Sequence, residues 1–149
     1  MINFKRLSIL ALALALLAFG AFAASPTDIT TGAQTATGTG ALTGTLDMHA
    51  LSGNFTLKVQ VTSLTCTTCT SATNVKIVLE DSVNAFTASI PVAVVDVSGP
   101  IAGSGVTYSI PWYQVPSLRL GVSSAVLRAN VYSYGTNVTG VTVHAWIEQ

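Results

Sequence analysis

Apolar and polar residues alternate along most of the chain after position 41. In the clearest stretch, every second residue from Phe55 to Val61 is apolar and the residues between them are polar. Successive side chains on a β-strand point to opposite faces, so this period of two predicts a strand with one buried face. The same reasoning predicts further strands at residues 75–80, 106–112, 118–122, 126–134 and 141–147.

Residues 86–97 form a long apolar run that Pro91 interrupts. Proline cannot donate a hydrogen bond to a sheet, so we expect an edge strand, a bulge or two short strands there. Glycines and prolines separate the apolar segments, and none beyond the N-terminal run has the period of an amphipathic helix. About 7–8 strands in residues 41–149 predict an all-β domain, a two-sheet antiparallel sandwich with an Ig-like or jelly-roll topology.

The first 23 residues follow a different pattern. Lys5 and Arg6 precede an almost unbroken apolar run, and small residues surround Ala23. A basic start, an apolar middle and a small-residue end are typical of a secretory signal peptide, which predicts cleavage before Ala24. The alternative is an uncleaved membrane anchor, for which the apolar run is short. We therefore expect a secreted, extracellular or cell-surface protein that contacts a membrane only if the signal stays attached.

Residues 24–40 consist almost entirely of Thr, Gly, Ala and Ser, and Ile29 is their only large apolar side chain. Such a segment cannot build a core by itself, which predicts a flexible arm. A second interpretation is an extended arm that adds as a strand to the sheet of a neighbouring subunit. The candidate positions of this inter-subunit arm are Thr30, Ala36, Leu42 and Leu46.

Charged residues make up 8% of the chain, against about 25% in ordinary soluble domains. Removing Lys5 and Arg6 with the signal leaves four basic and six acidic residues, a formal charge of −2. No basic patch is present to neutralise phosphates, so we expect no binding to nucleic acid. Close association of a surface rich in Thr and Ser desolvates little charge, which favours packing against another copy or another surface protein.

Two cysteines, Cys66 and Cys69, form a C-x-x-C motif between two predicted strands. The motif is compatible with a disulfide, a redox centre or half of a metal site. A thioredoxin-type centre needs a helix after the first cysteine, and a strand follows here. A zinc site needs four ligands, and only His49 and His144 remain. Because an exported chain meets oxidising conditions, we expect a structural disulfide and neither a metal nor a cofactor.

No catalytic motif stands out. The chain has no G-x-S-x-G, no H-E-x-x-H and no P-loop, which argues against an enzyme. His144 has the outward parity of its predicted strand. Glu80 and Asp81 are adjacent on a strand and should point to opposite faces, so they cannot share acid–base work.

Aromatic residues are the best candidates for an interaction surface. Exposed aromatic rings can anchor a protein contact or stack on carbohydrate, and buried ones only pack. All three interpretations are open for the aromatic residues that border turns or lie on outward parities. These candidates are Trp112, Tyr113, Tyr132, Tyr134 and Trp146.

Two resemblances can be drawn. A Thr/Gly-rich arm before a sandwich resembles a bacterial fimbrial subunit, with residues 30–46 in the place of the donor strand. The chain departs from that pattern because its cysteines are three positions apart, whereas fimbrial disulfides are widely spaced. Residues 116–120, Leu127-Arg128 and Ala145-Trp146 resemble β-sandwich proteins associated with phage capsids. Neither resemblance assigns a family.

The sequence therefore predicts a non-enzymatic, exported structural protein. The most concrete form is a self-associating subunit of an extracellular or cell-surface assembly, such as a filament or a pilus-like fibre. The alternatives are a secreted ligand- or carbohydrate-binding module, a virion-associated β-sandwich protein, and a redox protein that uses the two cysteines.

Overall fold

A computed structural model describes residues 26–49, 51, 53–70, 73–115 and 117–149. The predicted signal peptide lies outside these residues. No helix in the described part of the chain is long and apolar enough to cross a membrane. The elements are β1 (Thr27–Asp28), β2 (Gln34–Ala36), β3 (Gly40–Ala41), β4 (Leu46–Asp47), β5 (Thr56–Cys66), β6 (Asn74–Ser82), β7 (Ile90–Ser98), β8 (Val106–Pro111), the 3-10 helix η1 (Trp112–Gln114), β9 (Val126–Tyr134) and β10 (Val138–Glu148).

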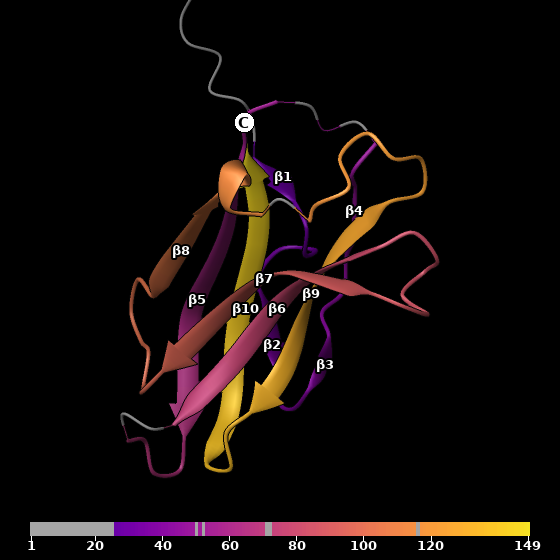
Figure 1. The fold of residues 1–149 in the computed structure, drawn as a ribbon. Helices are drawn as coiled ribbons and strands as arrows, with labels where there is room; N and C mark the ends of the chain where they lie inside the picture. The colour runs from indigo at the N-terminus through magenta and orange to yellow at the C-terminus, as the bar shows by residue number, and fades with distance from the viewer. Residues whose placement is uncertain (1–25, 50, 52, 71–72, 116) are drawn as a thin grey trace, which may run out of the picture.

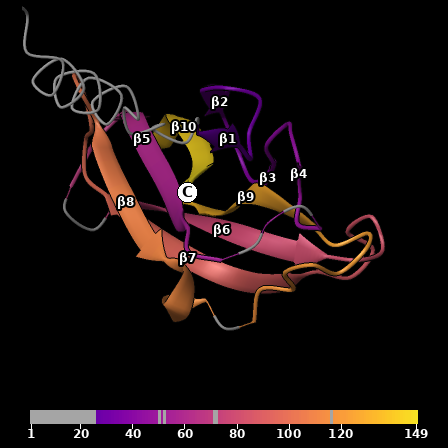
Figure 2. The same cartoon turned by 90° about the horizontal axis from the view of Figure 1, so that it is seen from above.

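The strands form two antiparallel five-stranded sheets packed together, which confirms the predicted all-β sandwich. Sheet 1 has the order β8–β5–β10, and both β1 and β2 pair with the other side of β10. Sheet 2 has the order β7–β6–β9, and both β3 and β4 pair with the other side of β9. In Figure 1, β6, β7 and β9 lie across β5 and β10, and Figure 2 shows the two layers from above.

The order of the strands follows a simple rule. β1 and β2 are two pieces of one broken edge strand, and β3 and β4 are two pieces of another. If each broken edge counts as one strand, the domain has eight strands in chain order. The first (β1 with β2) pairs with the eighth (β10), and the second (β3 with β4) pairs with the seventh (β9). The third (β5) pairs with the sixth (β8), and the fourth (β6) pairs with the fifth (β7). Consecutive strands therefore lie in different sheets, except for the β6–β7 hairpin.

The core lies between the two sheets, and the alternation in the sequence predicted its composition. Leu57, Val59 and Val61 of β5 are fully buried, and so are Ile77 and Leu79 of β6. In β5 the polar residues between them are only partly covered and line the outer face, whereas in β6 the intervening Val78 is itself buried.

The prediction of a strand at residues 118–122 is wrong, because the structure has turns there. The Leu118 N–H donates to the Val115 carbonyl, and the Leu120 N–H donates to the Leu118 carbonyl. The backbone N–H and the guanidinium of Arg119 both donate to Asp81. The backbone N–H groups of Leu118, Arg119 and Leu120 are used in these bonds, so they are not available to pair with a neighbouring strand. Leu118 is buried against the core although it lies in a loop.

The prediction for residues 86–97 is confirmed in two respects. β7 is an edge strand of sheet 2, and its register with β6 shifts beside Pro91. The strand begins only at Ile90, since Ala85 and Phe86 have positive φ angles of 53° and 62° in the preceding turn. The Ser82 hydroxyl inside this turn accepts from the Phe86 N–H at 3.0 Å.

The segment predicted as a flexible arm borders the chain's own sheets. Its described part, from Pro26 onward, contributes β1 and β2 to sheet 1 and reaches sheet 2 at β3. Ile29 is fully buried, and the Thr30 hydroxyl accepts from the Ala145 N–H at 3.0 Å. Backbone pairing, the Thr30 hydrogen bond and one buried apolar side chain together hold this segment against the sheets.

Candidate functional site

The five candidate aromatic residues do not form one cluster. Trp112 and Tyr113 lie together in η1, whereas Trp146 is on the outer face of sheet 1 and Tyr132 is on that of sheet 2. Tyr134 is partly buried and donates its hydroxyl proton to the Ala36 carbonyl at 3.1 Å. Burial raises the pKa of Tyr134. Only the first two residues form an exposed aromatic pair.

The aromatic pair borders a groove at the end of sheet 1. The Trp112 N–H donates to the Phe55 carbonyl at 3.1 Å, which fixes η1 against the start of β5. The two rings meet edge to face, with centroids 6.3 Å apart and planes at 82°. We call this space the aromatic groove. It has a volume of about 430 Å³ and is lined by Asn54, Phe55, Thr56, Pro111, Trp112, Tyr113, Glu148 and Gln149.

A polar network crosses the outer face of sheet 1 beside the groove. Asp28 lies 2.9 Å from the His144 ring nitrogen, and the His144 and Trp146 rings are 4.8 Å apart. The Trp146 indole N–H donates to Glu148 at 3.1 Å, and the Lys58 ammonium lies 3.2 Å from the same carboxylate. The hydrogen bond from Trp146 lowers the pKa of Glu148, and Lys58 adds to the effect. Glu148 therefore stays ionised down to acidic pH.

Sheet 2 contains two buried carboxylates on opposite faces, as their adjacent positions predicted. Glu80 lies on the outer face, where it accepts from Arg128 at 3.0 Å and from Asn130 at 2.9 Å. Asp81 is fully buried on the core side and accepts three hydrogen bonds from Arg119. Each carboxylate is thus bound to its own arginine, which fits structural ion pairs rather than a proton-transfer pair.

Sequence reasoning missed both arginine partners. Arg119 is 38 positions from Asp81, and Arg128 is 48 positions from Glu80. Only the strand register brings β6 beside β9, and only the fold of the β8–β9 loop carries Arg119 to Asp81. The Arg128 guanidinium also lies 3.9 Å from the centre of the Phe86 ring, so a cation–π contact holds the turn before β7.

The free edge of sheet 2 is the long strand β7. It pairs only with β6 among the described strands, and the Tyr108 hydroxyl lies 3.5 Å from its Asp96 carbonyl. Ile90 and Val94 are exposed on it, and Tyr132 is exposed nearby. Val94 and Tyr132 lie at a shallow groove of about 400 Å³, which is also lined by Lys76, Val78, Glu80, Ser89 and Pro91.

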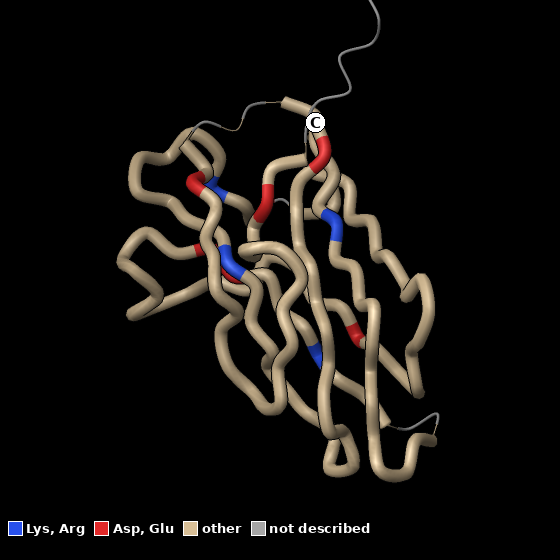
Figure 3. Tube along the Cα trace, turned by 180° about the vertical axis from the view of Figure 1, so that it is seen from behind, with Lys and Arg blue, Asp and Glu red and all other residues tan. Residues whose placement is uncertain are grey.

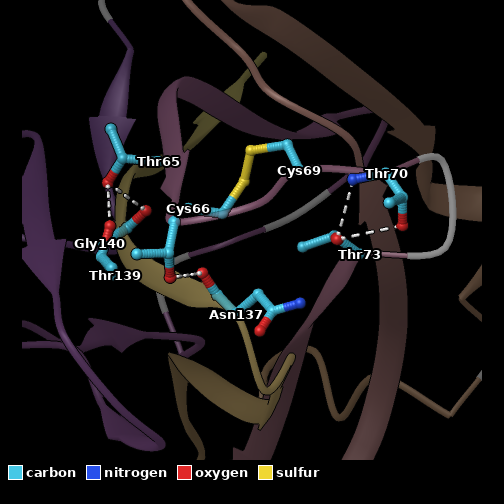
Figure 4. The surroundings of a disulfide bond; sticks show 9 residues. Thr65, Cys66, Cys69, Thr70, Thr73, Asn137, Thr139 and Gly140 are labelled. Atoms are coloured by element: carbon cyan, nitrogen blue, oxygen red, sulfur yellow. Dashed lines mark hydrogen bonds between the residues drawn. A yellow bond between two sulfur atoms is a disulfide. The ribbon is translucent and has the colours of Figure 1, made fainter.

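The predicted disulfide is confirmed. Cys66 ends β5, and its bond to Cys69 closes the turn that leads the chain from sheet 1 to sheet 2 (Figure 4). The next residue, Thr67, hydrogen-bonds to the Asn137 carbonyl through its N–H at 2.9 Å. Within the described ranges, no three His, Cys, Asp or Glu side chains come together as a metal site would require.

No known protein family, curated protein or solved structure was found to match this chain.

Proposed function

We propose that this protein is a non-enzymatic, exported structural protein whose copies associate through β7. In this proposal it is a subunit of an extracellular or cell-surface assembly such as a filament. The observation that carries the proposal is a nine-residue apolar edge strand with no strand partner on one side among the described residues.

An unpaired edge strand attracts another strand because its outward N–H and C=O groups need partners. Proteins that stay monomeric usually shorten such edges or place lysines and prolines along them. β7 contains no lysine, and Pro91 is only its second residue. Exposed Val94 and Tyr132 beside the edge add apolar area that a neighbouring copy can cover.

Charge also supports association between copies. All four basic residues of the predicted mature chain form ion pairs within it: Lys58 with Glu148, Lys76 with Asp96, Arg119 with Asp81 and Arg128 with Glu80. Charged positions are few and scattered over the chain (Figure 3). Repulsion between copies is therefore weak, and no cation is left over for a polyanion.

We further infer a jelly-roll topology from the strand order, in which the first of the eight strands pairs with the last and each following strand pairs one step further inward. Jelly rolls occur in viral capsid and lectin domains, so the topology is compatible with assembly and with sugar binding. The fold alone does not choose between them. The disulfide between Cys66 and Cys69 supports the proposed export, because disulfides persist in oxidising compartments.

Two modes of association differ in what they require. Direct pairing of β7 with β7 of a second copy needs no rearrangement and gives a closed dimer. Donation of the predicted inter-subunit arm to β7 of the next copy gives an open, head-to-tail chain. Donation needs the arm to leave its own sheets, where Thr30 and Leu46 are buried and Ala36 and Leu42 contribute to the edges. A filament therefore requires this exchange or a second contact.

The test is the assembly state of residues 24–149, measured by analytical ultracentrifugation and negative-stain microscopy. We expect dimers or longer assemblies that Val94→Lys dissociates, because the introduced ammonium would have to be desolvated at the paired edge. Val122→Lys is the matched control, since Val122 is exposed in the β8–β9 loop and does not belong to β7. A strict monomer at the highest soluble concentration would refute the proposal.

A further inference from the structure

We propose that the aromatic groove at η1 is a binding site for a neutral saccharide. It lies where η1, the start of β5 and the end of β10 meet, and Figure 1 shows the coil of η1 next to the C-terminal end of β10.

The aromatic side of the groove offers apolar faces to a ligand. Trp112 is 43% exposed and Tyr113 is 66% exposed, although both follow an ordered strand and belong to a hydrogen-bonded turn. Their edge-to-face arrangement makes an open corner, in which one ring can lie under a sugar while the other contacts its edge. The C–H face of a pyranose is apolar, so it is suited to stack on such a ring.

The polar side of the groove is fixed in position before any ligand arrives. Glu148 pairs with Thr56 across sheet 1, and Thr56 pairs with Pro111, which leads directly into η1. Trp146 and Lys58 hold the Glu148 carboxylate from the outer face of the sheet. Restraint of this kind lowers the entropy lost on binding. The Glu148 carboxylate, the Thr56 hydroxyl and the Asn54 amide line the groove and can hydrogen-bond to the hydroxyls of a sugar.

The charge of the lining selects the class of sugar. Among the described lining residues, Glu148 has the only charged side chain, and its lowered pKa keeps the carboxylate ionised at neutral and mildly acidic pH. The nearby Lys58 ammonium is already bound to Glu148 and to the Ser109 hydroxyl at 3.0 Å. An acidic or sulfated sugar would therefore meet a negative charge without a free cation, whereas a neutral sugar would not.

The size of the groove suits a small ligand. Binding sites for small molecules usually have volumes of about 300–1,000 Å³, and a groove of about 430 Å³ accommodates a mono- or disaccharide unit. Longer chains would extend out of the open groove. The site belongs to sheet 1, and it shares no lining residue with the groove beside β7. A result that rules out saccharide binding would therefore leave the proposed self-association through β7 standing, and the reverse also holds.

The experiment is isothermal titration of residues 24–149 with soluble oligosaccharides of glucose, xylose and N-acetylglucosamine, with oligogalacturonate as the acidic probe. We expect saturable binding of at least one neutral series and weaker or no binding of oligogalacturonate. Tyr113→Ala should weaken binding by about tenfold, a change of about 1.4 kcal/mol, and Tyr113→Phe should retain most of it. Tyr132→Ala is the matched control, because Tyr132 is 65% exposed but lies on sheet 2.

Two results would overturn this assignment. The first is no saturable binding of any neutral series up to about 10 mM. The second is binding that Tyr113→Ala leaves unchanged or that Tyr132→Ala weakens equally, since the sugar would then bind elsewhere. Circular dichroism of each variant checks that the fold is retained.

Discussion

The two sheets are built from the same number of strands but differ on their outer faces. The outer face of sheet 1 carries Lys58, Gln60 and His144, and its edge strand β8 has six residues and ends in Pro111. Sheet 2 carries exposed Val94 and Tyr132 together with the Lys76–Asp96 and Arg128–Glu80 ion pairs, and its edge strand β7 has nine residues. The longer edge and the exposed apolar side chains of sheet 2 support the proposal that copies associate through sheet 2, whereas the proposed saccharide site lies on sheet 1.

The broken N-terminal edge strands provide the largest test of this comparison. Ile29 lies beside sheet 1 and is fully buried, whereas Ile90 is exposed on the free edge of sheet 2. Ile29→Ala should lower the free energy of unfolding by about 3 kcal/mol, because it leaves a cavity in the core. Ile90→Ala should lower it by less than about 1 kcal/mol. Urea unfolding measures both, and equal losses would show that the N-terminal segment is not anchored.

The ion pairs of the two sheets should give the next largest difference in the free energy of unfolding. Asp81→Asn should lower the free energy of unfolding by about 3 kcal/mol, since it removes one charge of a pair whose carboxylate is fully buried. Glu148→Gln, the corresponding acid-to-amide change on sheet 1, should alter stability little, because its pair is exposed. Chemical unfolding at neutral pH compares the two variants. A large loss of stability for Glu148→Gln with none for Asp81→Asn would show that the exposed ion pair, and not the buried one, stabilises the fold.

The disulfide, which closes the turn between sheet 1 and sheet 2, should contribute somewhat less to stability than the Asp81–Arg119 ion pair. Closing a loop of this size removes unfolded-state entropy worth about 2 kcal/mol. The double variant Cys66→Ser, Cys69→Ser should therefore unfold earlier in urea while its assembly state stays the same, since neither cysteine belongs to β7. A variant that folds normally but no longer associates would connect the disulfide to assembly.

The smallest expected effect depends on pH. Because the folded-state pKa of Glu148 is lowered, its contribution to stability is fully present above the unfolded-state pKa, near the ordinary glutamate value of 4.5. That contribution is lost as the pH falls through the folded-state pKa. Glu148→Gln should remove this part of the acid dependence, as measured by thermal unfolding between neutral pH and about pH 2.5. An identical acid profile in the variant would show that the hydrogen bond from Trp146 does not form in solution.

Part of this architecture could be read from the sequence, because local alternation records which face of a strand is buried. It located β5, β6, β9 and β10, and Pro91 marked the edge strand. The position of a residue in the folded topology has no local signal, so the sequence could not tell which aromatic candidates lie together, and the structure places them at separate sites. The Arg119 partner of Asp81 was missed for the same reason. The burial of Ile29 did have a signal, a lone large apolar residue, which the low complexity around it obscured.

The central claim is that β7 pairs with another copy of the chain. Amide hydrogen exchange of residues 92–97, measured at low and high protein concentration, tests it most directly. We expect the β7 amides that point away from β6 to become protected as the concentration rises, while the β5 amides do not change. Exchange at β7 that is independent of concentration, in a sample that nevertheless assembles, would contradict it.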